Sequence, residues 1–199
     1  KKESDLNKRC FLNLKDGILT LNDFRIIPHN PEYLSTIQLN VKYIENEKWL
    51  LWERTLNEIF EDDKEKVKIL QEYFGLCLTT ETKYEKALFL LGDGANGKSL
   101  ISFILQEMLG RDNYSAISLD KFNNPHYTAN LFNKLANISI ETNAKSQVYD
   151  SVFKSVASGD EIEADRKFKP PFGFRPYCKL IFALNNMPRV DDKTEGFFR

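Results

Sequence analysis

The sequence predicts an α/β protein, and three observations carry this prediction. The apolar stretch at 87–91 (ALFLL) has the length and composition of a buried strand, and it runs directly into a glycine-rich loop and a helical stretch at 100–109. Two further apolar strands are expected at 135–140 (LANISI) and 179–184 (KLIFAL). Before them, the first 80 residues combine a β-hairpin pattern with two amphipathic helices.

Composition and charge are those of an ordinary globular protein. The 199 residues include 28 Lys and Arg against 29 Asp and Glu, so the net charge is -1 and a polycationic tail is excluded. No apolar run approaches the roughly 20 residues of a membrane helix, and the first residues lack a signal-peptide pattern. We therefore expect a cytoplasmic protein with no membrane partner.

The cysteines and histidines do not have metal-ligand spacing. Cys10, Cys77 and Cys178 stand far apart without a CxxC pair, and His29 and His126 are the two histidines of the chain. This spacing predicts three reduced thiols and gives no reason to expect zinc.

A hairpin is expected at the start of the chain. Apolar and polar side chains alternate over 11–28 around Asp16-Gly17, a dipeptide that suits a tight turn because glycine accepts positive φ. The polar stretch at 79–86 is the best boundary candidate, and it divides the chain into an N-terminal hairpin and helical region at 1–80 and a second domain at 81–199.

Two amphipathic helices are expected between the hairpin and the boundary. Apolar residues have helical spacing over 47–60, and a second such set follows the acidic residues 61–63, which suit a helix start. Trp49 and Trp52 could be base-stacking platforms, but aromatic residues at this spacing are more often core residues, so we assign them no function.

The glycine-rich loop has the pattern GxxxxGKS between a strand and a helix. Its glycines let backbone N–H groups converge on phosphates, Lys98 can reach the β- and γ-phosphates, and the Ser99 hydroxyl can bind Mg²⁺. The alternative is a glycine-rich turn without a ligand, which the flanking strand and helix disfavour. The pattern predicts binding of ATP with Mg²⁺ by Gly92, Asp93, Gly94, Ala95, Asn96, Gly97, Lys98 and Ser99.

Two polar residues follow the later strands. Glu141 comes directly after 135–140, where a carboxylate could hold Mg²⁺ and polarise the attacking water. Asn185 follows 179–184, where its amide could orient that water or bind the γ-phosphate. The alternatives are a glutamate that merely ends a strand and a structural asparagine turn before Pro188.

A basic and aromatic segment lies at 159–179. Cations suit a nucleic-acid backbone and aromatic rings suit its sugars or bases, although a solvated hairpin would have a similar composition. The segment's cations are Arg166, Lys167, Lys169, Arg175 and Lys179, and its rings are Phe168, Phe172, Phe174 and Tyr177.

Taken in order, these features resemble the superfamily 3 helicase domain of phage, plasmid and poxvirus-type primase-helicases. The resemblance lies in GDGANGKS, NLFNKLANISIETN, FKSVASGDEIEADRKFKPPFGFRPYCKLIFALNNMP and the final GFFR, and the preceding residues resemble the domain before the ATPase in those proteins. It implies an AAA+ P-loop NTPase core with a central, mainly parallel sheet. It also implies a ring, usually hexameric, that hydrolyses ATP to translocate 3′→5′ on single-stranded DNA.

The resemblance also assigns roles to residues. Lys98, Glu141, Asn185 and Arg199 take the family's catalytic positions; Ser99 and Glu141 take those that hold Mg²⁺. Lys154, Gly159 and Asp160 match a third conserved block. Arg199 lies in a terminal arginine pair, one member of which acts on the ATP of the neighbouring subunit. The family's DNA-contacting hairpin aligns with Arg166, Lys167, Phe168 and Lys169, where Phe168 stands in place of a histidine.

The resulting prediction is an ATP-dependent DNA helicase or translocase of a phage, virus, plasmid or mobile element. The given chain is expected to be a fragment that ends before a further apolar strand, and a primase domain or partner is possible. Two alternatives remain: an ATP-regulated replication initiator or scaffold without unwinding activity, and a P-loop small-molecule kinase. Stimulation of ATP turnover by single-stranded DNA would disfavour the kinase, and strand displacement would disfavour the initiator.

Overall fold

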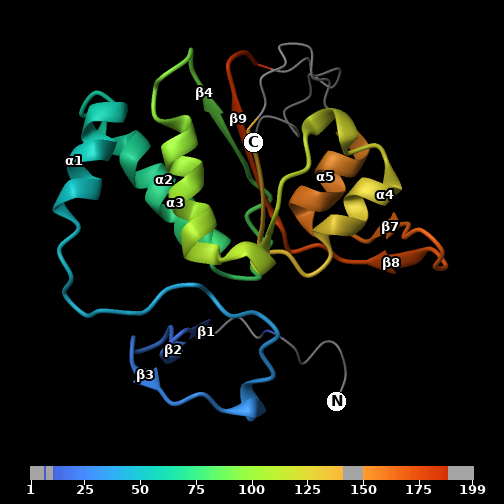
Figure 1. Ribbon diagram of the computed structural model, residues 1–199, viewed down its shortest axis with the longest axis horizontal. Coiled ribbons are helices and arrows are strands. Elements are labelled where there is room, and N and C mark those ends of the chain that lie inside the picture. The colour runs from blue at the N-terminus through green and yellow to red at the C-terminus, as the bar shows by residue number, and fades with distance from the viewer. Residues whose placement is uncertain (1–6, 8–10, 141–149, 188–199) are drawn as a thin grey trace.

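A parallel four-stranded sheet forms the centre of the computed structural model, which describes residue 7, residues 11–140 and residues 150–187. Its strand order is β4-β9-β6-β5, all parallel (Figure 1). The strands are β4 (Ala87–Leu91), β5 (Tyr114–Ser115), β6 (Ala136–Ile140) and β9 (Lys179–Leu184). The three strands expected from apolar runs are therefore confirmed, and the mixed α/β fold is confirmed with them.

Helices cover both faces of this sheet. Figure 1 shows α2 (Lys64–Cys77) and α3 (Lys98–Leu109) on one side, and α4 (Pro125–Thr128) and α5 (Asp150–Ser158) on the other. Strand β9 is buried along its whole length, and its side chains alternate between the two cores. Ile181 and Ala183 lie in the core under α2 and α3, whereas Leu180, Phe182 and Leu184 lie in the core under α5.

Polar contacts connect the helices and loops to the strands. The buried Tyr73 hydroxyl on α2 lies 2.9 Å from the Leu180 carbonyl oxygen and 3.1 Å from that of Lys86. The buried Lys179 ammonium donates to the carbonyl oxygens of Thr79 and, at 2.9 Å, Tyr177. Lys179 is therefore a buried structural residue. It is not one of the cations of the basic segment that could contact a nucleic-acid backbone.

The two N-terminal helices are α1 (Leu50–Ile59) and α2. As the acidic residues predicted, α2 begins at an acidic N-cap: the Asp63 carboxylate accepts from the backbone N–H groups of Glu65 and Lys66 at 3.1 Å. Trp52 packs against Phe74, with ring centroids 6.4 Å apart. Trp49 is 47% exposed at the start of α1, so its interpretation as a core residue is wrong.

A separate antiparallel sheet contains β1 (Phe11–Leu14), β2 (Gly17–Thr20) and β3 (Ile26–Ile27), in that order. The hairpin is confirmed, but Leu14 pairs with Gly17, so Lys15 and Asp16 form the turn. Gly17 is needed for a different reason: a Cβ there would lie 2.6 Å from the Ile27 carbonyl oxygen on the neighbouring strand.

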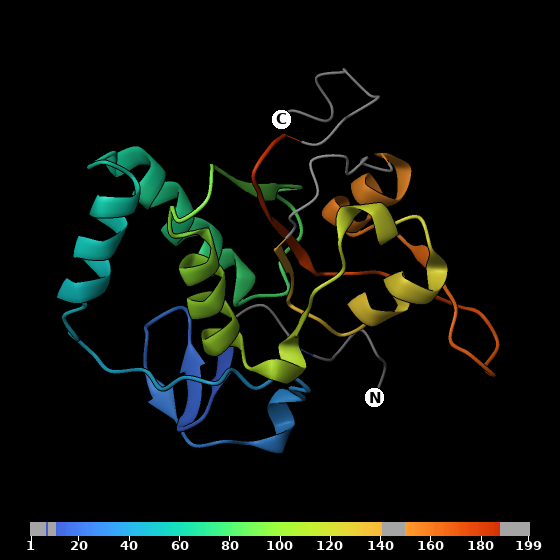
Figure 2. The ribbon, with the colours of Figure 1, turned by 45° about the horizontal axis from the view of Figure 1, so that its top comes forward.

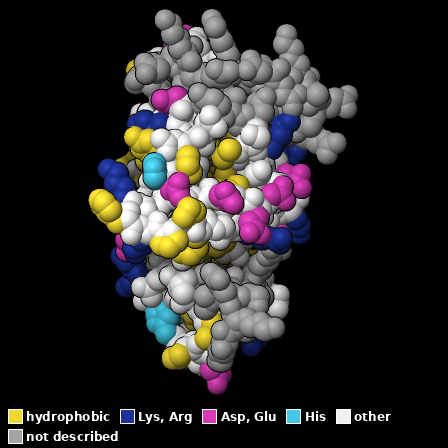
Figure 3. Space-filling view, turned by 90° about the vertical axis from the view of Figure 1, so that its right-hand side faces the viewer, with side chains coloured by type: hydrophobic (Ala, Val, Ile, Leu, Met, Phe, Trp, Pro, Cys, Tyr) yellow, Lys and Arg dark blue, Asp and Glu magenta, His cyan; other side chains and the backbone are white. Residues whose placement is uncertain are grey.

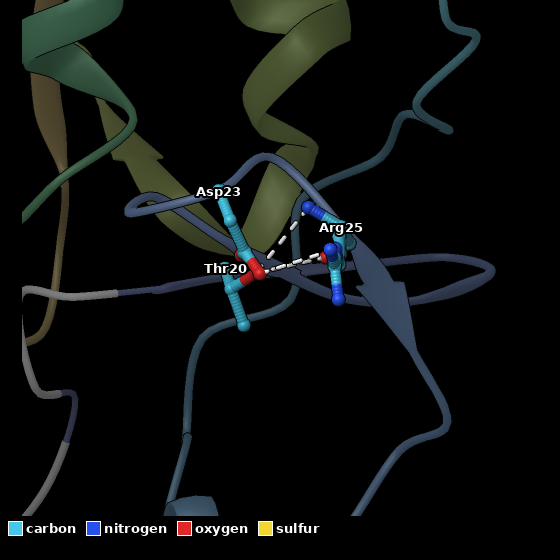
Figure 4. Close-up of polar contacts among 3 residues, drawn as sticks. All are labelled: Thr20, Asp23 and Arg25. Carbon is cyan, nitrogen blue, oxygen red and sulfur yellow. Dashed lines mark hydrogen bonds and ion pairs between the residues drawn. The ribbon is translucent and has the colours of Figure 1, made fainter.

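A compact polar turn joins β2 to β3 (Figure 4). The Thr20 hydroxyl donates to the Asp23 carboxylate, and the Arg25 guanidinium lies 3.3 Å from that carboxylate. The Thr20 hydrogen bond and then the Arg25 charge lower the pKa of Asp23, because both favour its ionised form. The hydrogen bond and the ion pair of Asp23 hold the turn that leads into β3.

The N-terminal sheet lies against the end of α3 (Figure 2). The segment 38–40 makes the connection: the Asn40 N–H donates to the Met108 carbonyl oxygen at 3.0 Å, and the Asn113 amide donates to that of Gln38 at 2.7 Å. A single hydrophobic cluster includes Leu14 and Leu39 as well as Ile101 and Leu105. The expected division of the chain near residue 80 stays a prediction.

The remaining elements are short. A small antiparallel pair is formed by β7 (Ile162–Ala164) and β8 (Phe172–Phe174). The 3₁₀ turns are η2 (Pro31–Tyr33), η3 (Arg111–Asn113), η4 (Leu119–Lys121) and η5 (Ala129–Leu131). Within the residues that the structure describes, no helix is long and apolar enough to cross a membrane.

Candidate functional site

The predicted phosphate loop connects the carboxyl end of β4 to the start of α3. Gly97 is the residue before the helix, with φ +82, and Lys98 and Ser99 are the first two helical residues. In the described part of the chain, no side chain caps this end of α3, so its first N–H groups face the loop. A helix start of this kind, preceded by glycines, attracts anions through its free N–H groups and its dipole.

The loop is folded around the Lys98 ammonium group. Lys98 donates to the Gly92 carbonyl oxygen, to the Asp93 carbonyl oxygen at 3.1 Å and to the Asn96 amide oxygen at 2.7 Å. The Asn96 amide also packs so closely on Gly92 that a Cβ there would lie 1.9 Å from its nitrogen. At the exposed top of the loop, Ala95 adopts a positive φ of 62°.

The end of helix α1, in the N-terminal region, packs against the loop. A Cβ on Gly97 would lie 2.4 Å from the Ile59 Cδ1 atom at the end of α1, so a side chain at 97 would collide with that helix. A cavity of about 480 Å³ lies beside the loop and is lined by, among others, Ile59, Phe60, Leu91, Asn96 and Lys98. Its lining combines apolar with polar and charged side chains, as that of small-molecule sites does.

The carboxyl ends of the neighbouring strands meet the loop. The Gly92 N–H donates to the Leu184 carbonyl oxygen at 3.3 Å, which places the end of β9 directly beside the start of the loop. Asn185 is the next residue and is exposed there. In β6, Ile140 pairs with Ala183. Glu141 and Arg199 lie outside the described residues, so their expected roles stay predictions.

Gly159 and Asp160, which match the third block of the family that the sequence resembles, lie directly after α5. Gly159 has φ +77 just after the helix, and a Cβ there would lie 3.0 Å from the Thr82 side chain. The Asp160 N–H donates to the Ser155 carbonyl oxygen at 2.9 Å, and its carboxylate accepts from the Ser158 hydroxyl at 2.6 Å. Gly159 and Asp160 thus form the C-terminal end of this helix, while Lys154 lies within it.

The basic segment forms a hairpin, as expected, with its turn between β7 and β8. Lys167, Phe168 and Lys169 are exposed in that turn, and the Phe168 ring is fully exposed, with φ +63. The other three rings of the segment are not available for stacking: Phe174 is buried, and Phe172 and Tyr177 are partly buried. Phe172 and Phe174 pack on one hydrophobic core and Tyr177 on the other, so Phe168 is the ring of this segment that is exposed.

The face around the hairpin is not uniformly basic. Figure 3 shows hydrophobic side chains there among both Lys or Arg and Asp or Glu side chains. At the base of the hairpin, the Arg175 guanidinium lies 3.9 Å from the Glu161 carboxylate. The cations of this face therefore alternate with acidic and apolar side chains.

Two structural features went unrecognised in the sequence. Asn137 is fully buried in β6, where its side chain bonds to Ser115 and to both backbone groups of Ile117. A polar residue within the apolar run 135–140 was the available signal. The contact between Ile59 and Gly97 had no signal in the sequence, because 38 positions separate the two residues.

Two protein families match the chain. Residues 90–199 match the family described as "Family of unknown function (DUF5906)", and residues 2–61 match the family described as "D5 N terminal like". The first match spans more than half of the 199 residues, so the chain belongs to the DUF5906 family.

Similar proteins include a viral protein and two solved structures. A protein of Acanthamoeba polyphaga mimivirus named "Putative helicase L207/L206" is 24% identical over 180 residues, covering 85% of this chain and 19% of that protein. An apo structure of the NrS-1 C-terminal region has a TM-score of 0.64 and 18% identity over 78% of this chain and 37% of that chain. A second has a TM-score of 0.61 and 16% identity, over 79% and 44% respectively.

These similarities differ in what they establish. At 18% and 16% identity, the NrS-1 structures show a shared fold alone. The chain spans about a fifth of the mimivirus protein and less than half of each NrS-1 chain.

Proposed function

We propose that this member of the DUF5906 family is the ATP-hydrolysing motor of a replication helicase, of the primase-helicase kind, and that it moves on single-stranded DNA. The observation that carries the proposal is the loop at 92–99, which lies at the carboxyl end of a parallel strand and surrounds the Lys98 ammonium with three oxygen atoms. In open α/β sheets, ligands bind at this edge.

The loop residues fit a bound triphosphate. Lys98 has three oxygen partners within the loop, and in the proposed complex phosphate oxygens would take their place. The first N–H groups of α3, which no side chain of the described residues caps, would also donate to the phosphates. Ser99 follows Lys98 and is exposed, and its hydroxyl would hold Mg²⁺. The cavity bounded by Ile59 and Phe60 has an apolar wall for the base. The core would then be a P-loop NTPase of the AAA+ type.

Hydrolysis in this proposal uses residues at the ends of the adjacent strands. Asn185 follows the strand that is hydrogen-bonded to the loop, and its amide would orient the attacking water. Glu141 follows β6, the next strand in the sheet, and its carboxylate would hold Mg²⁺ and polarise that water. Arg199 would act on the site of a neighbouring subunit in a ring, so full activity would require assembly.

The hairpin provides the proposed DNA contact. Lys167 and Lys169 are exposed in its turn and would contact phosphates, while Phe168 has a fully exposed ring that would stack on a base or sugar. The name of the mimivirus relative and the D5-type N-terminal match support a helicase rather than a kinase. The activity of the whole protein is part of this proposal, since the chain spans only a part of its relatives.

ATP binding and turnover, measured with and without single-stranded DNA, test the proposal. Lys98→Ala should reduce ATP turnover at least a hundredfold, because the phosphates lose their fixed cation, and the fold should persist because the loop is at the surface. Lys68→Ala is the matched control: this lysine is exposed on α2, where its ammonium lies 3.8 Å from the Glu72 carboxylate and far along the chain from the loop. Parent-like turnover in Lys98→Ala would contradict the phosphate-loop assignment.

The same assays distinguish the alternatives. DNA-stimulated turnover together with strand displacement is the expected result for a motor. Turnover that DNA does not change, with phosphate transferred to a small molecule, would indicate a kinase. ATP binding that changes only DNA affinity or assembly, with no displacement of a strand, would indicate an initiator or scaffold.

A further inference from the structure

The side chain of Arg166 lies against two aromatic rings at the base of the hairpin turn. Its guanidinium carbon is 4.6 Å from the centroid of the Phe172 ring and 5.3 Å from that of Phe132. Both distances are within the range of cation–π contact. The planar guanidinium is suited to such stacking, whereas a lysine ammonium is a compact and strongly hydrated charge.

These rings belong to an aromatic cluster that also includes Phe174. Phe132 meets Phe172 edge-on at 5.5 Å and 89°, and meets Phe174 at 5.4 Å and 86°. Phe172 and Phe174 are stacked at 5.6 Å. Phe172 and Phe174 come from β8, but Phe132 follows η5 and lies four residues before β6. The cluster therefore joins the hairpin to the segment that leads into the central sheet.

Arg166 is also the first residue of the exposed turn. The Lys169 N–H donates to the Arg166 carbonyl oxygen at 3.0 Å, and this bond closes the turn that carries Lys167 and Phe168. On its other side, the Asp165 N–H donates to the Pro125 carbonyl oxygen of α4 at 3.1 Å. The His126 ring nitrogen also lies 3.4 Å from the Asp165 carbonyl oxygen, so the start of the turn is held by two contacts to α4 and by the side chain of Arg166.

We propose that Arg166 is a positioning residue that holds the hairpin turn in the direction that presents Lys167 and Phe168, and that it does not itself bind a DNA phosphate. This inference rests on the proposed function of the turn as the DNA contact. A phosphate contact by Arg166 is the alternative role, because its side chain is exposed and contact with the rings leaves guanidinium N–H groups free.

Single-stranded DNA affinity as a function of salt concentration separates the two roles. Removing one phosphate contact makes the logarithmic salt slope shallower by about 0.7 for a single strand. Lys167→Ala should show that change. Arg166→Ala should bind about three- to tenfold more weakly with the parent slope. Phe132→Leu should behave like Arg166→Ala, and the double variant should be no weaker than Arg166→Ala alone, since the stack is already absent.

Hydrogen exchange without DNA gives a second readout. The amides of residues 165–171 should exchange faster in Arg166→Ala and Phe132→Leu than in the parent, while Lys167→Ala should match the parent. Unfolding of Phe132→Leu would appear as faster exchange throughout the sheet, and the substitution Phe132→Tyr, which keeps the ring, would then replace it as the ring control and should match the parent.

The outcomes for the two proposals are distinct. A shallower salt slope in Arg166→Ala, equal to that of Lys167→Ala, would overturn the positioning role. Unchanged exchange at 165–171 in Arg166→Ala would also overturn it. If instead all variants bind DNA like the parent while exchange rises as expected, Arg166 positions the turn and the proposed DNA contact is the part that fails.

Discussion

Gly97 is a position of the phosphate loop where a side chain would be strained. Its φ of +82 is unfavourable for other residues, and a Cβ would lie 2.4 Å from Ile59. Gly75, in α2, is different: among the described residues, a Cβ there would have no neighbour within 4 Å. The two glycines therefore form a matched pair for testing whether contact with α1 shapes the loop.

Gly97→Ala should weaken ATP binding at least tenfold, because alanine is strained at φ +82 and its Cβ would meet the Ile59 side chain, so the loop and the Lys98 ammonium must shift. Gly75→Ala should keep parent ATP affinity and raise stability by about 0.5–1 kcal/mol, since alanine is the better helix residue. Nucleotide titration and thermal unfolding of both variants measure these effects. Equal ATP affinity in Gly97→Ala and the parent would show that the loop shape does not depend on α1.

The thiols of Cys77 and Cys178 are fully buried and free. Burial raises the pKa of the Cys77 thiol to about 12, and it also raises the pKa of Cys178, because an apolar interior disfavours the thiolate. The thiolate is the reactive form. These two residues therefore agree with the expected reduced state, while Cys10 lies outside the described residues.

In a Cys10→Ser background, the two remaining thiols should resist alkylation at pH 8 in the folded protein and react fully after denaturation. Folding stability should fall as the pH rises from about 9 to 12, because the unfolded thiols lose protons that the folded ones retain. The double variant Cys77→Ala/Cys178→Ala should show a smaller fall over that range. Rapid labelling of the native protein at pH 8 would be inconsistent with the buried positions.

The side chain of Asn137 in strand β6 bonds this strand to the residues at and after β5. The Asn137 amide oxygen accepts from the Ser115 hydroxyl at 2.9 Å and from the Ile117 N–H at 2.7 Å, and its nitrogen donates to the Ile117 carbonyl oxygen at 2.9 Å. The chain after the short strand β5 is thereby bonded to β6 beyond the end of their backbone ladder. β6 leads to Glu141, so its position bears on the proposed site.

Asn137→Leu should destabilise the protein by roughly 2 kcal/mol or more, because the Ile117 N–H and carbonyl oxygen would remain buried without partners. Asn130→Leu, at an exposed asparagine of η5, is the control and should change stability by less than about 0.5 kcal/mol. Denaturant unfolding of both variants measures the difference. Similar stabilities would mean that the Asn137 bonds contribute little to folding.

The two regions of the chain share a hydrophobic core. Leu56 of α1 is fully buried in the cluster that also contains Ile101 and Leu105 of α3 and Ile138 of β6. Such contacts couple the stability of the N-terminal helices to that of the sheet, since a cavity in a shared core affects both sides. The proposed nucleotide site then depends on both regions, as the Ile59 contact with Gly97 also indicates.

Leu56→Ala should cost about 2–5 kcal/mol, and the protein should still unfold in a single transition in which helical and tertiary signals change together. Leu51→Ala should have little effect, because Leu51 is 79% exposed on the same helix. Calorimetry and circular dichroism of the two variants measure the loss of stability and the number of unfolding transitions. Two separate transitions in Leu56→Ala would support independent domains divided near residue 80.

The sequence by itself determined the local elements. The apolar runs and the acidic N-cap of α2 act through neighbouring residues, and each produced the expected strand or helix start. The GxxxxGKS pattern likewise located the loop, because its glycines and lysine act within eight consecutive residues. The resemblance to the helicase hairpin located the exposed turn with Lys167 and Phe168, which composition alone had left open.

Only the tertiary structure decided which side chains of each element are exposed and which are buried or paired with another residue. Lys179 is buried against carbonyl oxygens, Trp49 is exposed, and the Arg166 guanidinium contacts the rings of Phe132 and Phe172. These outcomes depend on residues far away in the chain, and a composition or spacing pattern contains no information on them. Burial and partner choice are set when elements pack, because the cost of an unpaired polar group or an empty space arises only at that stage.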